Sequence, residues 1–121
     1  MSVRIKDATI ISIEDAETKK LKMLKITSKL ENATLTLEIP DALCDPFNVK
    51  DLVAVTISSE PIPRGEKAKL YAEGTVFKVN EAENFEVVVT IGGLRMEFEM
   101  PSPKPTQRKA FDSEKIFLAL N

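Results

Sequence analysis

The stretch TIGGLRMEFEM, residues 90–100, decides the fold because its apolar alternation changes phase at two adjacent glycines. Before the glycines the apolar side chains stand at odd positions, and after them at even positions. These residues are Phe85, Val87, Val89 and Ile91, followed by Leu94, Met96, Phe98 and Met100. Side chains of a strand point alternately to opposite faces, so the change means either a bulge in one strand or a turn between two.

A hairpin with Gly92 and Gly93 as its turn explains this pattern, because it places apolar side chains opposite one another. The expected inner pairs are Ile91 with Leu94, Val89 with Met96, Val87 with Phe98, and Phe85 with Met100. The expected outer pairs are Thr90 with Arg95 and Val88 with Glu97. A type I′ turn requires positive φ at both central residues, which glycine adopts without steric cost. We therefore predict a hairpin over residues 85–100.

Length and charge limit the kinds of protein that this chain can be. Its 121 residues, 43% of them hydrophobic, are enough for one domain with a core. A net charge of -2 and a pI near 5.3 argue against a domain that holds nucleic acid by itself, so any such role would have to be local. The first residues do not read as a secretory signal, and no apolar run approaches the roughly 18 residues of a membrane span. We expect a cytoplasmic protein.

Cysteine and histidine usage argues against catalysis and metal binding. Cys44 is the only cysteine and histidine is absent, so an intrachain disulfide, a thiolate metal cage and every nucleophile paired with histidine are excluded. We predict no catalytic residues, no metal and no cofactor. Cys44 could be a reactive thiol, but nothing adjacent would lower its pKa apart from a helix terminus, so a small buried apolar residue is the favoured interpretation.

Six further segments have the alternation or β-branched composition of strands. They are residues 3–13, 19–29, 34–39, 52–58, 69–79 and 115–120. In the first, Val3, Ile5, Ile11 and Ile13 share one face. A tight turn at residues 31–32 would place Leu24, Ile26 and Leu30 opposite Ile39, Leu37 and Ala33. Gly74 lies inside 69–79, as expected of a strongly bent strand.

The connections complete the prediction of the fold. Residues 41–51 are expected to form a helical turn or an irregular crossover, and residues 59–67 an exposed loop. Residues 101–113 contain three prolines and are predicted to be extended and mobile, like the loop at 59–67. About eight strands without a long helix indicate an all-β protein, with residues 1–121 forming a single small antiparallel OB-type Greek-key barrel.

The segment 19–29 is rich in lysine, and an OB barrel binds oligonucleotides on the face of its second and third strands. The lysines are Lys19, Lys20, Lys22, Lys25 and Lys29. Lys25 and Lys29 are expected to point outward beside Thr34, Thr36 and Glu38, as a candidate nucleic-acid face. The alternative is a solvated face or an interface for an acidic partner, which we favour because the face lacks aromatic rings on which bases could stack.

Two other surface features have competing explanations. Glu97 and Glu99 could form a carboxylate pair for acid–base chemistry or a cation, but a charged outer face is the favoured interpretation. A set of apolar residues is too large for one small barrel interior, which predicts that some of them form a contact with another protein. These are Tyr71, Phe77, Val88, Met96 and Met100.

The order of the segments TLTLEI, LVAVTISSE, YAEGTVFKVNE, TIGGLRMEFE and KIFLAL resembles a family of transcription proteins. The family is the eighth small subunit, or subunit 8, of archaeal and eukaryotic DNA-dependent RNA polymerases. The resemblance runs from about Leu35 to Leu120. Its most specific element is the Gly-Gly-Leu-x-Met core, with a Gly-Thr strand before it: Gly92, Gly93, Leu94, Met96, Gly74 and Thr75. The short loop at 59–67, and Arg95 and Glu97, are like the compact archaeal form and differ from the eukaryotic one.

The resemblance implies an OB-type barrel that is a non-catalytic, peripheral subunit docked chiefly on the largest polymerase subunit. The metal-bound aspartates of the polymerase reaction belong to other subunits. Our hypothesis is that the glycine turn lets a partner approach closely, with Gly92, Gly93, Leu94 and Arg95 as the contact. The rival hypothesis is a free-standing single-strand-binding OB module that uses Lys25 and Lys29.

Overall fold

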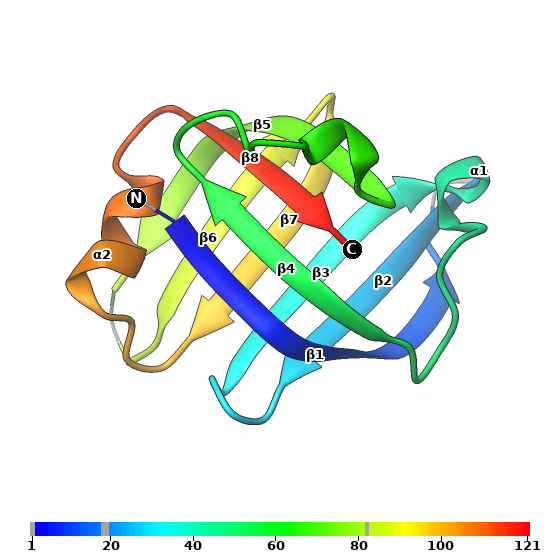
Figure 1. The fold of residues 1–121 in the computed structure, drawn as a ribbon, viewed down its shortest axis with the longest axis horizontal. Coiled ribbons are helices and arrows are strands. Elements are labelled where there is room, and N and C mark those ends of the chain that lie inside the picture. Colours follow the sequence, from blue (N-terminus) through cyan, green and yellow to red (C-terminus); the bar gives the residue numbers. More distant parts are fainter. Residues whose placement is uncertain (1, 18–19, 82) are drawn as a thin grey trace.

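The computed structural model describes residues 2–17, 20–81 and 83–121, and within them the chain forms a closed antiparallel barrel of eight strands (Figure 1). The order around the barrel is β1-β2-β3-β7-β6-β5-β8-β4. The strands are β1 (Ser2–Asp15), β2 (Leu21–Ser28), β3 (Ala33–Pro40), β4 (Leu52–Ser58), β5 (Leu70–Asn80), β6 (Phe85–Ile91), β7 (Leu94–Met100) and β8 (Lys115–Leu120). The predicted all-β barrel is confirmed, and it is compatible with the OB type.

The core fills the barrel interior with one face of each strand. In β3 the buried residues alternate strictly, at Ala33, Leu35, Leu37 and Ile39. Each fully buried leucine or isoleucine side chain contributes about 1.5–3 kcal/mol relative to its exposed state. Met96 and Met100 also lie in the core, so these two residues of the apolar surplus are accommodated inside.

The β6–β7 hairpin has the predicted register. Ile91 pairs with Leu94, and the six further pairs follow in order down to Phe85 with Met100. Gly92 and Gly93 have φ values of 56° and 87°, the left-handed conformation that the type I′ turn requires. The change of phase in the sequence is therefore a turn and not a bulge.

The predicted register between β2 and β3 is wrong by two residues. Leu24 pairs with Leu37 and not with Ile39, because the turn spans four residues, 29–32, instead of two. The N–H of Glu31 donates to the Ser28 hydroxyl, which stabilises this longer turn. A shift of two keeps Leu24 and Ile26 in the core but leaves Leu30 81% exposed.

Strand β1 is longer than predicted and carries two irregularities that change which side chains face inward. Its register shifts between Ile5 and Ala8 against β4, and between Ile10 and Ser12 against β2. Val3 and Ile5 are buried as expected, but Ile11 lies at the second shift and is 46% exposed. An extra residue at a bulge reverses the facing of the residues after it, which simple parity does not anticipate.

The segment 101–113 is not extended, contrary to the prediction. It contains the helical turn α2 (Pro105–Arg108) and the 3₁₀ turn η2 (Lys109–Phe111). Pro105 occupies the first helical position, where its missing N–H costs nothing, and the Gln107 side chain accepts a hydrogen bond from the N–H of Lys104. Phe111 is buried against Phe98, with ring centroids 5.7 Å apart, so this segment packs against the barrel core.

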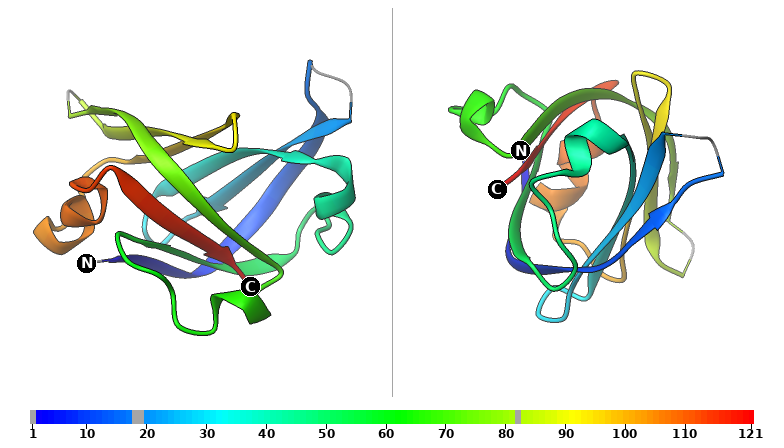
Figure 2. Two further views of the ribbon diagram at one scale, coloured as in Figure 1. Left: turned by 90° about the horizontal axis from the view of Figure 1, so that it is seen from above. Right: turned by 90° about the vertical axis from the view of Figure 1, so that its right-hand side faces the viewer.

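The helical turn predicted within residues 41–51 and the exposed loop predicted at residues 59–67 are both present. The helical turn α1 (Asp41–Cys44) lies between β3 and β4, and the 3₁₀ turn η1 (Gly65–Lys67) belongs to the loop after β4. Figure 2 shows α1 at one end of the barrel and α2 at the other. Among the helices in the described part of the chain, none is long and apolar enough to cross a membrane.

Candidate functional site

The turn of the β6–β7 hairpin projects from the barrel without side chains. Gly92 and Gly93 are both exposed, and a Cβ atom added at either would meet nothing within 4 Å. The two glycines are therefore needed for their positive φ values and not for internal packing. The open space beside them is accessible to another molecule.

Leu94 and Arg95, the other two predicted contact residues, follow the turn on β7. Leu94 is half-buried, whereas the Arg95 guanidinium is exposed and lies 2.6 Å from a carboxylate oxygen of Glu97. The N–H of Arg95 donates to Glu38 Oε1 at 3.0 Å, which ties the hairpin to β3. An exposed ion pair of this kind contributes less than about 1 kcal/mol, so a partner could replace it at little cost.

A bulge in β5 brings an aromatic ring to the same wall of the barrel. The register between β5 and β6 shifts between Val76 and Lys78, which leaves Phe77 as the extra residue. Phe77 is 74% exposed although it lies within a strand. Bulges redirect side chains, and here the bulge places Phe77 outward together with Lys78.

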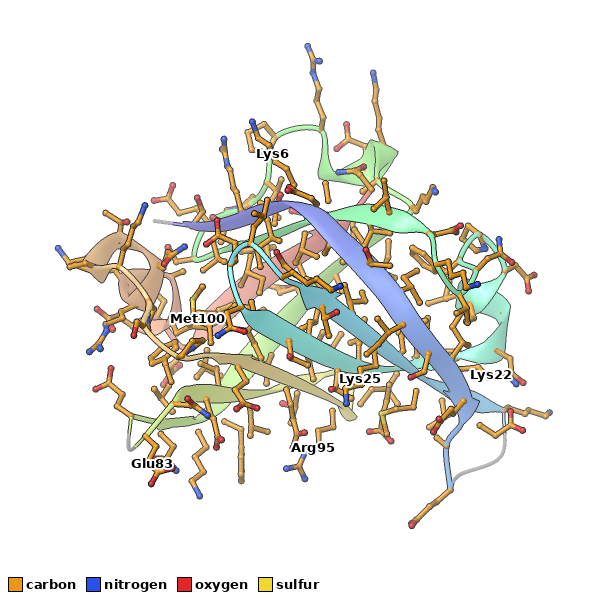
Figure 3. The ribbon with its side chains drawn as sticks, turned by 90° about the horizontal axis from the view of Figure 1, so that it is seen from below. Lys6, Lys22, Lys25, Glu83, Arg95 and Met100 are labelled. Carbon is orange, nitrogen blue, oxygen red and sulfur yellow. The ribbon has the colours of Figure 1, made fainter. Side chains whose placement is uncertain are left out.

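These features meet in one groove on the outer wall formed by β5, β6 and β7. The groove has a volume of about 430 Å³, and its lining includes Phe77, Val88, Gly93 and Arg95. We call these four residues the hairpin face. Figure 3 shows the labelled Arg95 pointing outward, away from the barrel. The groove thus joins Gly93 and Arg95, two of the four predicted contact residues, to two residues of the apolar surplus, whereas Gly92 and Leu94 do not line it.

The sequence predicts some of the residues that line this groove but not how they come together. Phe77 and Val88 were recognised as surplus apolar residues, but their position beside Gly93 depends on the β5 bulge. Lys78 and Glu86, which also line the groove, were not singled out. Gly74 was the one signal for an irregular strand, but it does not specify where the bulge falls.

The predicted lysine face has mixed charge. Lys25 is exposed on β2 opposite Thr36, and Thr36 is in turn opposite Glu97 of β7. Lys29 lies in the exposed β2–β3 turn, and Lys22 pairs with Asp15. Lys19 lies outside the described residues. The structure therefore does not gather the described lysines of this segment into one positive track.

The carboxylates of β7 have the neighbours of a charged outer face. Glu97 pairs with Arg95, and Glu99 accepts a hydrogen bond from the Asn84 amide at 2.8 Å. Both carboxylates are exposed. Within residues 2–17, 20–81 and 83–121, no group of three or more carboxylate or thiol side chains could hold a metal ion.

Cys44 is a buried residue at the end of α1, as predicted. Its side chain belongs to the core, with 8% of the residue exposed. Burial is the main cause that raises the pKa of the Cys44 thiol above the usual 9.0, with the carboxylates of Asp41 and Asp45 acting in the same direction. The nearby Lys22 ammonium acts against this shift but does not reverse it. A thiol with a raised pKa is a poor nucleophile at neutral pH.

A comparison of the chain with protein-family models finds no match, and a comparison with curated proteins finds none either.

Proposed function

We propose that this chain is a non-catalytic accessory subunit of a multisubunit DNA-dependent RNA polymerase. It supports assembly and stability of the enzyme by docking on the largest subunit through the hairpin face. The observation that carries the proposal is the side-chain-free turn at Gly92 and Gly93, which opens beside a groove containing the exposed ring of Phe77.

The physical properties of the hairpin face support a protein contact. A large exposed aromatic ring beside a groove is a common anchor of protein interfaces, where Tyr, Trp, Phe and Arg are enriched. The glycine turn lets a partner backbone approach without displacing a side chain. The Arg95–Glu97 pair at the rim can then exchange with charged groups of the partner.

The resemblance supplies the identity of the partner in this proposal. The barrel order brings β3, β7, β6 and β5 together as neighbours, and these strands carry most of the segments that resemble the polymerase subunit. The proposed partner is therefore the largest subunit, with the rest of the polymerase behind it. This chain needs no catalytic residue, metal or cofactor of its own for that role.

Two substitutions test the proposal, one in the hairpin face and one at Gly92, the turn residue beside it. Gly92→Asn produces an Asn-Gly turn, which suits the type I′ geometry but adds a side chain at the tip. Phe77→Ser removes the exposed ring without disturbing the core. We expect both variants to fold as the parent does and to lose association with the polymerase in copurification from cell extract.

Leu30→Ser is the matched control, because Leu30 is as exposed as Phe77 but lies far from the β6–β7 turn. Leu30 belongs to the β2–β3 turn at the start of β3, whereas the β6–β7 turn lies beside the end of β3. This variant should copurify with the polymerase as the unaltered protein does. Retention of the polymerase by folded Gly92→Asn and Phe77→Ser would reject the hairpin face as the docking site.

A further inference from the structure

A second groove lies on the opposite side of the barrel, where β1 and β4 meet the loop of residues 59–67. Its volume is about 320 Å³, and Arg4, Lys6, Thr56, Ile62 and Pro63 are among its lining residues. In the closed order of the barrel, β1 stands four strands away from β6, and β4 stands four strands away from β7. Figure 3 accordingly shows Lys6 and Arg95 projecting from opposite sides.

Strand β1 presents two cations to this groove. Arg4 and Lys6 are both exposed, and Arg4 lies opposite Thr56 of β4. Side chains two residues apart on a strand are separated by about 6.6 Å along its axis, which is comparable with the spacing of neighbouring phosphates on an extended nucleic-acid strand. Lys6 faces outward by the ordinary alternation of the strand, and the register shift between Ile5 and Ala8 leaves Asp7 exposed beside it.

The second wall of the groove is held in place by Tyr71. The N–H of Ile62 donates to the Tyr71 hydroxyl at 3.1 Å, and the Tyr71 ring stacks on Phe117 with centroids 6.2 Å apart. Gly65 packs directly on this ring, since an added Cβ would lie 2.5 Å from it. The loop therefore has a defined position on the outer surface of the barrel, which fixes Ile62 and Pro63 at the groove.

The charge of the groove differs from that of the whole protein. The chain carries a net charge of -2, yet the ionisable side chains that line the groove are Arg4 and Lys6, both cations. Asn121, the last residue of the sequence, lines the groove as well. Arg64 follows Pro63 in the loop and is exposed, and the same loop also exposes the carboxylates of Glu60 and Glu66, which do not line the groove. In the part of the chain that the structure describes, none of these three cations has an ion-pair partner within 4 Å. Asp7 is the nearest carboxylate along β1, and it does not line the groove.

We propose that this groove, the basic groove, binds the phosphate backbone of a single nucleic-acid strand. Arginine, lysine and threonine are residues that commonly contact phosphate, and Ile62 and Pro63 offer an apolar wall for the sugar. An extended acidic peptide fits less well, because β1 and β4 are paired on both sides and have no free edge to which a peptide could add as a strand. No aromatic ring among the described residues lines the groove, so bases cannot stack there as they do on single-strand platforms. The proposed binding therefore rests on phosphate contacts alone, which makes it weak, independent of base sequence and sensitive to salt.

This activity is independent of docking through the hairpin face. A protein held by its β6–β7 side would leave the β1–β4 side exposed, and the left view of Figure 2 shows the β6–β7 hairpin and the 59–67 loop on opposite sides of the barrel. The basic groove also differs from the predicted Lys25 and Lys29 face, which is next to carboxylates. An acidic protein needs a locally basic region to bind nucleic acid, and in this proposal that region is on β1.

The test uses the whole chain and a fluorescein-labelled oligothymidylate, with binding followed by fluorescence anisotropy at low salt. The double variant Arg4→Ser/Lys6→Ser is compared with Lys25→Ser/Lys29→Ser, which loses the same charge from the other face. We expect the first to weaken binding roughly tenfold and to reduce the slope of log K against log salt by about 1.4, the value for two lost phosphate contacts. The second should change binding little.

Three results would overturn the proposal. The first is absence of oligonucleotide binding by the unaltered protein at low salt, and the second is an equal loss in both double variants, which would indicate general charge attraction. The third is displacement of the oligonucleotide by polyglutamate at the same charge concentration as by unlabelled DNA, which would indicate an acidic protein partner. Each of these results leaves the hairpin-face copurification unaffected, so the two proposals fail separately.

Discussion

Single glycines in this barrel serve two different purposes, and the distinction decides what each substitution would do. Gly92 and Gly93 lie in open space and supply positive φ values. Gly74 lies inside β5 without a positive φ, and an added Cβ would lie 2.7 Å from Val89 Cγ1 and 2.8 Å from Ile91 Cγ1. Gly74 is thus a packing glycine, while the turn glycines are free for a role in binding.

Gly74→Ala should destabilise the barrel by about 1–3 kcal/mol, because the new methyl group overlaps two side chains and also approaches the Thr90 carbonyl oxygen at 3.0 Å. Urea unfolding followed by circular dichroism measures the change. Thr75→Ala, at the adjacent exposed position, is the control and should change stability by much less. An unaltered unfolding midpoint for Gly74→Ala would contradict the packing account.

Cys44 provides a prediction about pH. Burial, the main cause, raises the thiol pKa above 9.0 in the folded state, so ionisation favours the unfolded chain. The neutral thiol therefore contributes its full stability below the pKa that the thiol has in the unfolded chain. This contribution is lost as the pH rises through the higher pKa of the thiol in the folded protein. Iodoacetamide should therefore alkylate Cys44 more slowly in the folded protein than in urea, with the rate rising at higher pH when folded. Equal rates in both states would show that Cys44 is accessible.

At the scale of elements, the short helical segment between β7 and β8 is part of the core. Phe111 from η2 packs against Phe85 and Phe98, each with ring centroids 5.7 Å away. Phe111→Ala should cost about 3–5 kcal/mol, since it removes a buried ring and leaves a cavity. Chemical denaturation gives this value, and Lys109→Ala, an exposed change in the same turn, serves as control. A cost below about 1 kcal/mol would show that the segment is only loosely attached.

The sequence predicts some elements better than others, for physical reasons. The β6–β7 hairpin follows from its alternation and its Gly-Gly turn, since both constraints are local. The β2–β3 register does not, because the Ser28 hydroxyl stabilises a longer turn that keeps the same facing. The helical turn at Pro105 was missed because proline suggests extended chain as readily as a first helical position.

The candidate site was predicted only in part, because only some of its residues are close together in the sequence. Gly92 to Arg95 are adjacent in the sequence, so their proximity is certain. The groove joins Gly93 and Arg95 of this run to Phe77 through a bulge, and a bulge depends on packing across strands that one sequence pattern does not reveal. The basic groove combines residues from β1, β4 and the 59–67 loop, so it required the closed barrel to be known.

At the scale of the whole molecule, the closed barrel separates two outer walls. The hairpin face with Phe77 lies on β5 to β7, and the basic groove lies on β1 and β4. One wall offers an aromatic anchor and a turn without side chains, and the other offers the exposed cations Arg4 and Lys6. This arrangement suits an accessory subunit that docks by one side and remains open on the other.

The central claim, that the chain is a polymerase subunit, is tested most directly by its stoichiometry in a native complex. The tagged protein would be purified from its own cells at salt high enough to strip nucleic acid, and the copurifying chains quantified by mass spectrometry. Our account predicts recovery of the large polymerase subunits in a one-to-one ratio with the tagged chain. Recovery of the protein alone, with Gly92, Gly93 and Phe77 intact, would contradict it.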